Sequence, residues 1–259
     1  MSRRSEVLAV RYGTWETTRS QAYLHHEVYG SADAPVTLDY YFWIVRRPAG
    51  VVVVDTGFEA EAGRRRGRRL LIDPVEALDR LGVDRAEPLS LVVTHGHYDH
   101  IGNLAAFPRA TILMSRLEFH YWTGRYAGHP LFRTLAEPTE LALLRRAHGE
   151  GRVRFVTDRE EVASGVRVLL APGHTPGQLM VTVDDRTLLT SDAVHLEDEL
   201  DRTMPFRHMT DLLAAFGTYD HVRRLAAAGL TVVTGHDPAV HRRFPAVEGP
   251  LGEFAVTVS

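Results

Sequence analysis

Short apolar runs, bounded by Gly, Pro and charged residues, recur through the first half of the chain. The segments LDYYFWIV (38–45) and VVVVDT (51–56) are rich in β-branched and aromatic residues, and the turn-like RRPAG between them predicts a β-hairpin. The other segments of this half divide into strands and helices by the period of their apolar residues. They predict strands at 89–94 and 110–115, and helices at 73–82, 101–107, 115–122 and 137–151.

The second half repeats this order, with strands first and helices afterwards. Strands are predicted at 152–157, 166–172, 178–184 and 186–192, then one long or two short helices at 208–229, and a last strand at 230–235. We therefore predict an α/β fold with two mixed sheets packed face to face and helices outside, in a single domain over residues 1–259. A doubly wound parallel sheet is the weaker alternative, because the hairpin-like runs favour antiparallel pairing.

Composition excludes several classes of function. The chain has 259 residues, 44% hydrophobic and 24% charged, and its net charge of −3 gives no reason to expect nucleic acid or an anionic membrane as a partner. Cysteine is absent, which excludes disulfides, thiolate metal ligands and a cysteine nucleophile. The N-terminus lacks the pattern of a signal peptide, and no apolar run approaches the ~18 residues of a membrane span. We expect a cytoplasmic protein, and its oligomeric state is not indicated.

His and Asp residues follow five of the predicted strands, in loops rich in Gly and Pro. The longest such loop is THGHYDHIGN (94–103), and burial of so many imidazoles and carboxylates is unfavourable unless something pairs with them. Strand ends often converge at one edge of a layered fold, where sites form. The residues concerned are Asp55, His95, His97, Asp99, His100, His174, Asp192 and His236.

These residue types and spacings predict a pair of divalent metal ions. His95 and His97 lie two apart, so both face one ion in an extended loop, with His174 completing that site. Asp99 and His100 follow where the chain turns into a helix and, with His236, hold the second ion. Asp192 bridges the two ions through its two oxygens. Zn²⁺ is the expected ion, although Mn, Fe or Co suit the same ligands.

Together these positions resemble the metallo-β-lactamase superfamily. The resemblance covers about residues 38–240 and rests on HxHxDH at 95–100, followed in order by His174, Asp192 and His236. It implies the αββα four-layer sandwich, and it implies that Asp55 holds the metal loop by hydrogen bonds without binding metal. Each His or Asp alone is more often a surface or capping residue, but chance does not explain the whole set.

Within this superfamily the chain looks most like the N-acyl homoserine lactonases, through THxHxDHxGN, GHTPGQ and SDA. That resemblance implies a lactone or related ester as the small-molecule partner, opened by a hydroxide that bridges the two ions. Asp99 then carries the proton to the leaving alkoxide. One position departs from the branch: a tyrosine is usual three residues after the bridging Asp, and here it is His195. We expect His195 to donate a hydrogen bond to the developing oxyanion, although a role as an inert pocket residue is an equal alternative.

Other activities of the same fold stay open. They are a glyoxalase II-type thioesterase, a phosphodiesterase or ribonuclease, a mononuclear-iron persulfide dioxygenase and a non-catalytic binding protein. A metal count separates the dioxygenase, which needs one iron, from a hydrolase with two ions. The aromatic stretch FHYWTGRYAGHPLF (119–132) is a candidate acyl-binding wall or lid, with core packing as the commoner role. The run GRRRGRR (63–69) is expected to be a solvated, mobile segment, or less often a contact for an anionic substrate or another subunit.

Overall fold

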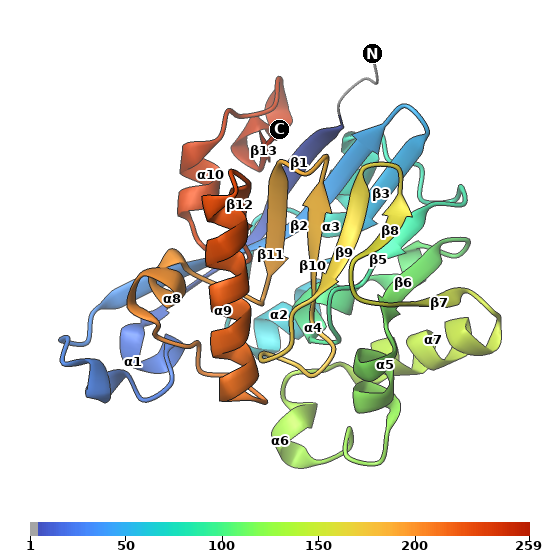
Figure 1. The fold of residues 1–259 in the computed structure, drawn as a ribbon. Coiled ribbons are helices and arrows are strands. Elements are labelled where there is room, and N and C mark those ends of the chain that lie inside the picture. The colour runs from blue at the N-terminus through green and yellow to red at the C-terminus, as the bar shows by residue number, and fades with distance from the viewer. Residues whose placement is uncertain (1–4) are drawn as a thin grey trace.

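The computed structural model describes residues 5–259 as two β-sheets packed face to face with helices outside (Figure 1). The first sheet has the order β13-β1-β2-β3-β5-β6-β7, with β4 paired to β1. Its strands are β1 (Glu6–Thr18), β2 (Pro35–Arg47), β3 (Gly50–Val54), β4 (Arg69–Leu70), β5 (Ser90–Val92), β6 (Thr111–Ser115), β7 (Val153–Val156) and β13 (Ala255–Thr257).

The second sheet has the order β12-β11-β10-β9-β8. Its strands are β8 (Glu160–Ala163), β9 (Val166–Leu170), β10 (Leu179–Val183), β11 (Thr187–Ser191) and β12 (Thr231–Thr234). Both sheets are mixed, because β1–β2–β3 and β9–β10–β11 pair antiparallel whereas β3–β5–β6–β7 and β11–β12 pair parallel. The prediction of two mixed sheets, with a β2–β3 hairpin in the first, is confirmed.

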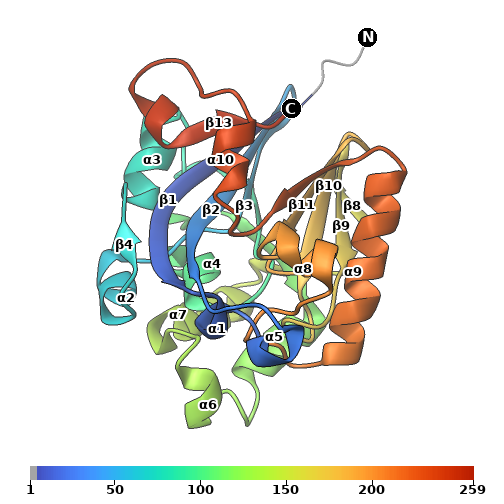
Figure 2. The same ribbon diagram turned by 90° about the vertical axis from the view of Figure 1, so that its left-hand side faces the viewer.

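Helices cover the outer face of each sheet. In Figure 2, α3 (Pro74–Arg80) lies outside the first sheet and α9 (Leu212–Ala227) lies outside the second. The other helices are α1 (Arg19–Ala22), α2 (Ala60–Arg65), α4 (Tyr98–Ile101), α5 (Arg116–Thr123), α6 (Pro130–Arg133), α7 (Pro138–Gly149), α8 (Glu197–Arg202) and α10 (Ala239–Arg243), with 3₁₀ turns η1 (His26–Tyr29), η2 (Leu104–Ala106) and η3 (Pro250–Glu253). In both ribbon views α1, α5 and α6 lie at the same end of the sandwich.

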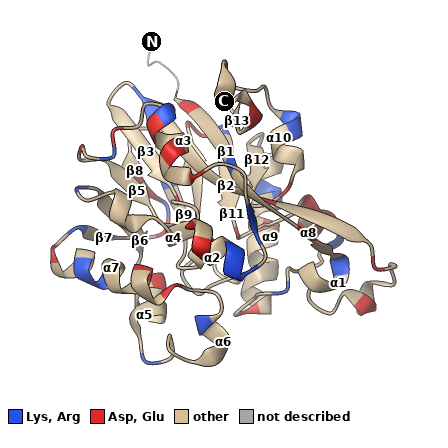
Figure 3. Cartoon of the chain, turned by 180° about the vertical axis from the view of Figure 1, so that it is seen from behind, with Lys and Arg blue, Asp and Glu red and all other residues tan. Residues whose placement is uncertain are grey.

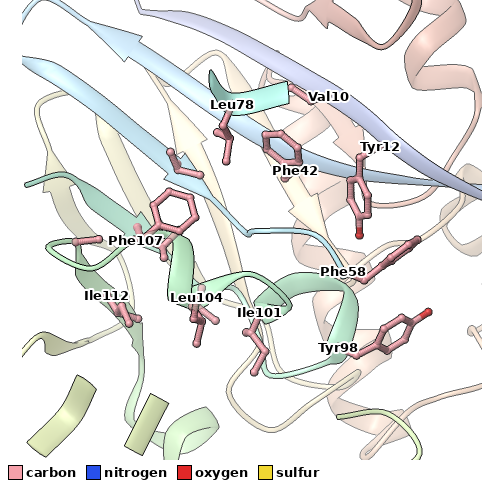
Figure 4. Packing of buried hydrophobic residues seen from close by; sticks show 14 of the residues in the cluster. Val10, Tyr12, Phe42, Phe58, Leu78, Tyr98, Ile101, Leu104, Phe107 and Ile112 are labelled. Carbon is pink, nitrogen blue, oxygen red and sulfur yellow. The ribbon is translucent and has the colours of Figure 1, made fainter. Parts of the chain in front are cut away.

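Strand β2 shows why its sequence is apolar without alternation. Tyr41 and Trp43 pack between the two sheets, whereas Phe42 packs outward against Leu78 of α3 and Phe107 (Figure 4). Successive side chains of a strand point to opposite faces, so a strand buried on both faces is apolar at every position. Helix α3 begins where the sequence predicts, because the Asp73 carboxylate accepts hydrogen bonds from the backbone N–H groups at 75 and 76.

The structure also corrects the predicted elements. The longest strands include β1, which the apolar pattern did not reveal because polar residues such as Arg11 and Glu16 interrupt it. Strands β8 and β13 were likewise not predicted. The predicted helix at 208–229 begins only at Leu212, because Asp211 caps it by accepting a hydrogen bond from the Ala214 N–H. Between residues 5 and 259, no helix combines the length and the apolar character that crossing a membrane requires.

Candidate metal centre

Strands of both sheets deliver His and Asp residues to one point. Strands β3 and β5 of the first sheet lead to Asp55 and to the loop that starts at His95, and β9, β11 and β12 of the second sheet lead to the other residues. None of the seven predicted ligands is more than 7% exposed: His95, His97, Asp99, His100, His174, Asp192 and His236. The structure therefore brings together the whole set that the sequence singled out.

The seven side chains form two groups that share Asp192. One group is His95, His97, His174 and Asp192, the other is Asp99, His100, Asp192 and His236, and in each the ligand atoms lie within 4.8 Å of one another. Asp192 Oδ2 lies 3.3 Å from His174 Nε2 and 3.7 Å from His95 Nε2. Its Oδ1 lies 3.1 Å from His100 Nε2 and 3.0 Å from His236 Nε2. Asp192 thus presents one oxygen to each group.

The outer ring nitrogens fix which nitrogen of each imidazole faces inward. His174 Nδ1 lies 2.7 Å from the His208 carbonyl, and His236 Nδ1 lies 2.8 Å from the Asp39 carbonyl. A carbonyl accepts and cannot donate, so each Nδ1 carries the proton and each Nε2 offers a lone pair to the centre.

Asp55 lies behind the second group and belongs to neither. Its Oδ2 lies 2.8 Å from His100 Nδ1, and its Oδ1 accepts a hydrogen bond of 2.8 Å from the Thr94 backbone N–H. Its φ of 64° places a non-glycine residue in the left-handed region, a strained backbone that the surrounding bonds must hold. These contacts tie the metal loop to the end of β3, as the family resemblance implies.

The donor set fits two divalent cations. Within residues 5–259, His100 Nε2 and Asp192 Oδ1 are buried and form no hydrogen bond, although they lie 3.1 Å apart; such burial is costly unless another group binds them. Burial lowers the pKa of His95 and His97 well below the ordinary value, so both imidazoles are neutral and have lone pairs available. Neutral imidazoles with carboxylates are suitable ligands for Zn²⁺.

Glu118 connects both metal loops, and sequence reasoning missed it. Its carboxylate is fully buried on α5 and accepts hydrogen bonds from the Gly96 N–H (2.9 Å), Trp122 Nε1 (2.5 Å), the Thr175 hydroxyl (2.7 Å) and the Gly177 N–H (3.0 Å). The two glycines permit this approach, since a Cβ would lie 2.3 Å from the Trp122 ring at Gly96 and 2.2 Å from the Glu118 nitrogen at Gly177. No local motif marks such a residue.

His195 lies beside the centre, as the sequence predicted. Its Nε2 is 3.1 Å from Asp192 Oδ2, its Nδ1 is 3.1 Å from Glu199 Oε1, and its ring stacks on Phe206 at 3.8 Å. Burial opposes charge on this imidazole, but the carboxylates of Asp192 and Glu199 raise its pKa to about 9. Glu199 also accepts a 2.6 Å hydrogen bond from the Tyr219 hydroxyl. The helical spacing of His195 and Glu199 was the available signal for this pair.

Two cavities open at the centre. A small one of about 60 Å³ is lined by metal-centre residues together with Tyr40, Arg68 and His195. A larger one of about 280 Å³ is lined by Tyr121, Phe132 and other residues of 121–135 and 207–210. Part of the predicted aromatic wall therefore does line a cavity. Its Phe119 and Trp122 belong to the hydrophobic core instead.

The arginine run at 63–69 is not the solvated segment that we expected. Arg64 and Arg65 are on the surface, but Arg66 donates a hydrogen bond of 2.5 Å to Glu137, and the Arg68 guanidinium stacks on Trp15. Tertiary partners from distant parts of the chain order the second half of this run.

Comparison with known proteins agrees with this geometry. Residues 38–236 match the Metallo-beta-lactamase superfamily. An N-acyl homoserine lactonase of Bacillus sp. is 26% identical over 144 residues, which is 54% of this chain and 52% of that protein, so the chain matches about half of that relative. The acyl-coenzyme A thioesterase MBLAC2 of Bos taurus is 27% identical over 212 residues, 75% of this chain and 71% of that protein.

Among solved structures, the crystal structure of a quorum-quenching N-acyl homoserine lactone lactonase has a TM-score of 0.73 with this chain. The two are 20% identical, and the superposition covers 92% of this chain and 95% of that chain. This likeness confirms the predicted α/β sandwich.

Proposed function

The chain belongs to the metallo-β-lactamase superfamily, and we propose that it is a metal-dependent hydrolase that opens the ring of a small lactone, with N-acyl homoserine lactones as the first class to test. One observation carries the proposal: Asp192 presents its two oxygens to two separate groups of buried ligands. A second cation site sharing a carboxylate suits hydrolysis of an ester-type bond. The lactonase relative supports the choice of a lactone.

Two ions would be held by the residues named above. His95, His97 and His174 would hold one, Asp99, His100 and His236 the other, and Asp192 both. Two bound divalent ions supply Lewis-acid chemistry: a water that ionises near neutral pH and stabilisation of oxygens that gain charge. Zn²⁺ is our proposed ion.

Asp99 is the proposed proton carrier. It lines the small cavity, and its Oδ2 lies 3.8 Å from His100 Nε2 and 3.9 Å from His236 Nε2. When water adds to the lactone carbonyl carbon, its proton passes to the Asp99 carboxylate. When the ring C–O bond breaks, Asp99 returns that proton to the alkoxide, so the product is a hydroxy acid.

His195 is the proposed hydrogen-bond donor to the carbonyl oxygen. Glu199 engages Nδ1 of the ring and also accepts a 2.6 Å hydrogen bond from the His195 backbone N–H. The ring is thereby fixed with Nε2 toward the cavity, and because its pKa is raised to about 9 both ring nitrogens carry protons near neutral pH, so Nε2 can donate. A donor held in advance at the position where negative charge develops lowers the barrier to acyl transfer.

A thioester is the second candidate substrate, because the Bos taurus relative is a thioesterase. The larger cavity, with Tyr121, Leu131 and Phe132 in its wall, suits the acyl chain of either substrate class. Metal analysis combined with an acid-release assay over lactones, acyl thioesters and phosphodiesters separates the possibilities.

We expect two ions per chain and acid release from lactones, and we expect Asp192→Ala to lose both ions and the activity. Hydrolysis of thioesters or phosphodiesters without lactones would overturn the substrate assignment. A single iron with oxygen uptake would indicate a persulfide dioxygenase instead.

A further inference from the structure

We propose that Arg68 forms an anion-recognition subsite beside the metal centre, so that the preferred substrate carries a small carboxylate group remote from the bond that is cleaved. This inference rests on the proposed function, since it names the class of lactone or ester that the site selects. It predicts a charged substrate, whereas a simple acyl homoserine lactone is neutral.

The side chain of Arg68 is held against the metal loop from three directions. Its Nη1 donates a hydrogen bond to the Arg66 carbonyl. Its guanidinium lies 3.7 Å from the ring centroid of Trp15 on β1, and its Nε donates a hydrogen bond of 3.3 Å to the Tyr98 hydroxyl. Tyr98 stands between two predicted ligands, His97 and Asp99. Arg68 is therefore fixed next to the centre before a substrate arrives.

The charge of Arg68 is not compensated, unlike that of its neighbours in the same run. Arg64 pairs with Glu61, Arg65 pairs with both Glu61 and Glu137, and Arg66 pairs with Glu137. Within residues 5–259, no carboxylate oxygen lies within 4 Å of an Arg68 nitrogen. Figure 3 shows acidic and basic residues together on α2, next to this segment. The Nε and Nη1 groups donate to the neutral oxygens of Tyr98 and Arg66, so the half-buried guanidinium keeps its charge and offers Nη2 to an anion.

The anion would lie at the Arg68 side of the same small cavity that Asp99 and His195 line. Arg68, Gln21 and Tyr40 line the small cavity of about 60 Å³, which accommodates a compact polar group. The carboxylates that also line it, Asp99 and Asp192, belong to the predicted ligand groups. An apolar substituent has the other cavity, of about 280 Å³. Both cavities are lined by His97, Leu135, His174 and His208, so they meet at the centre.

Matched substrates test this subsite in the metal-loaded protein. A γ-lactone with a carboxylate substituent is compared with the same lactone bearing a neutral carboxamide. We expect kcat/KM to be at least tenfold higher for the carboxylate. Arg68→Gln should lower that value by 10- to 100-fold, mainly through KM, and lower the value for the carboxamide lactone much less, so that the ratio between the two substrates falls toward one. Arg64→Gln, which removes an exposed arginine of the same run, should change neither. Metal content should stay at that of the unmodified protein in both variants.

Calorimetry with non-hydrolysable ligands separates failure of the subsite from failure of the proposed function. Cyclopentanecarboxylate should bind the metal-loaded protein at least tenfold more tightly than cyclopentanecarboxamide, and Arg68→Gln should abolish the difference. If neither lactone is hydrolysed but this difference is observed and Arg68→Gln abolishes it, the subsite stands and the lactonase proposal fails. A difference that persists in Arg68→Gln reflects carboxylate binding to the metal ions and would overturn the subsite. Equal hydrolysis of the two lactones, or equal effects of Arg68→Gln on both, would overturn the subsite while leaving lactone hydrolysis intact.

Discussion

Glu118 offers the sharpest test of how the metal centre is held together. Glu118→Gln replaces one carboxylate oxygen by an NH₂ group, while each oxygen now accepts two hydrogen bonds. Oε1 accepts from Gly96 and Trp122, and Oε2 accepts from Thr175 and Gly177. The Thr175 hydroxyl can turn to accept from the new amide, but a backbone N–H cannot. At least one buried donor therefore loses its partner in either orientation of the amide.

The expected cost follows from these contacts. Burial raises the pKa of the Glu118 carboxyl, and the four hydrogen-bond donors oppose that effect. The donors therefore favour the ionised carboxylate, and Glu118→Gln removes hydrogen bonds to a charged group. A hydrogen bond to a charged group contributes about 1.5–3 kcal/mol, and an unpaired buried donor costs about 1–3 kcal/mol. We expect Glu118→Gln to lower the free energy of unfolding of the metal-free protein by about 2–4 kcal/mol.

If Glu118 orients the metal ligands, its substitution also lowers metal affinity, which a purely structural role would leave unchanged. Gly96 lies between His95 and His97, and Thr175 follows His174, so the contacts of Glu118 are next to the three histidines of one ligand group. Loss of an outer hydrogen bond typically weakens metal binding about 10- to 100-fold. We expect dialysis against a weak chelator to leave about one ion per chain in Glu118→Gln, where the unmodified protein keeps two.

Chelator competition and elemental analysis measure this effect, with thermal unfolding of the metal-free protein in parallel. Glu140→Gln is the matched control, because Glu140 is also a buried carboxylate but accepts one hydrogen bond, of 3.2 Å from the Leu104 N–H, away from the ligands. If Glu118→Gln does not fold, Glu118→Asp keeps the charge and shortens the reach. Unchanged affinity for both ions in a destabilised variant would refute the positioning role.

Two further predictions concern His195 and Glu140. His195→Phe keeps the stacking on Phe206 but removes the donor, so steady-state kinetics should show kcat lowered about 100- to 1,000-fold with metal content unchanged. An unaltered kcat would make His195 an inert pocket residue. Burial raises the pKa of Glu140 from 4.5 to about 7, so its contribution to stability is complete below about 4.5 and is lost as pH rises through 7. Denaturant unfolding should therefore show that Glu140→Gln gains about 1–3 kcal/mol over the unmodified protein between pH 5 and pH 8, and parallel pH curves for the two proteins would contradict this assignment.

Much of the metal centre could be predicted because its ligands lie close together in the sequence or a few residues after a strand. His95, His97, Asp99 and His100 follow β5 within six positions, and the side chains of a short loop at a strand end have few places to go. His174, Asp192 and His236 each follow another strand directly. The prediction required only that five strand ends meet, which two packed sheets with parallel pairs provide.

The residues around the ligands could not be predicted in the same way. Glu118 is a charged residue on an otherwise apolar helix face, and its four partners lie 4 to 59 positions away along the chain. Glu199 depends on the fold for Tyr219, which approaches it from α9. Glu118 and Glu199 act through tertiary contacts that form only when the chain has folded, so no spacing in the sequence predicts their roles.

Arg68 shows how one missed element changes a functional interpretation. A run of arginines without an apolar period is normally solvated, and Arg64 and Arg65 behave that way. The chain reverses after Gly67, however, and continues as β4, which pairs with β1 at Gly13 and Thr14. That pairing brings Arg68 onto Trp15 and toward the metal loop. Strand β1 was not predicted because polar residues interrupt its apolar pattern. Without β1, nothing in the sequence indicated that Arg68 packs on Trp15. From the sequence, a contact with an anionic substrate was the less favoured interpretation of this run. The packing of Arg68 favours that interpretation.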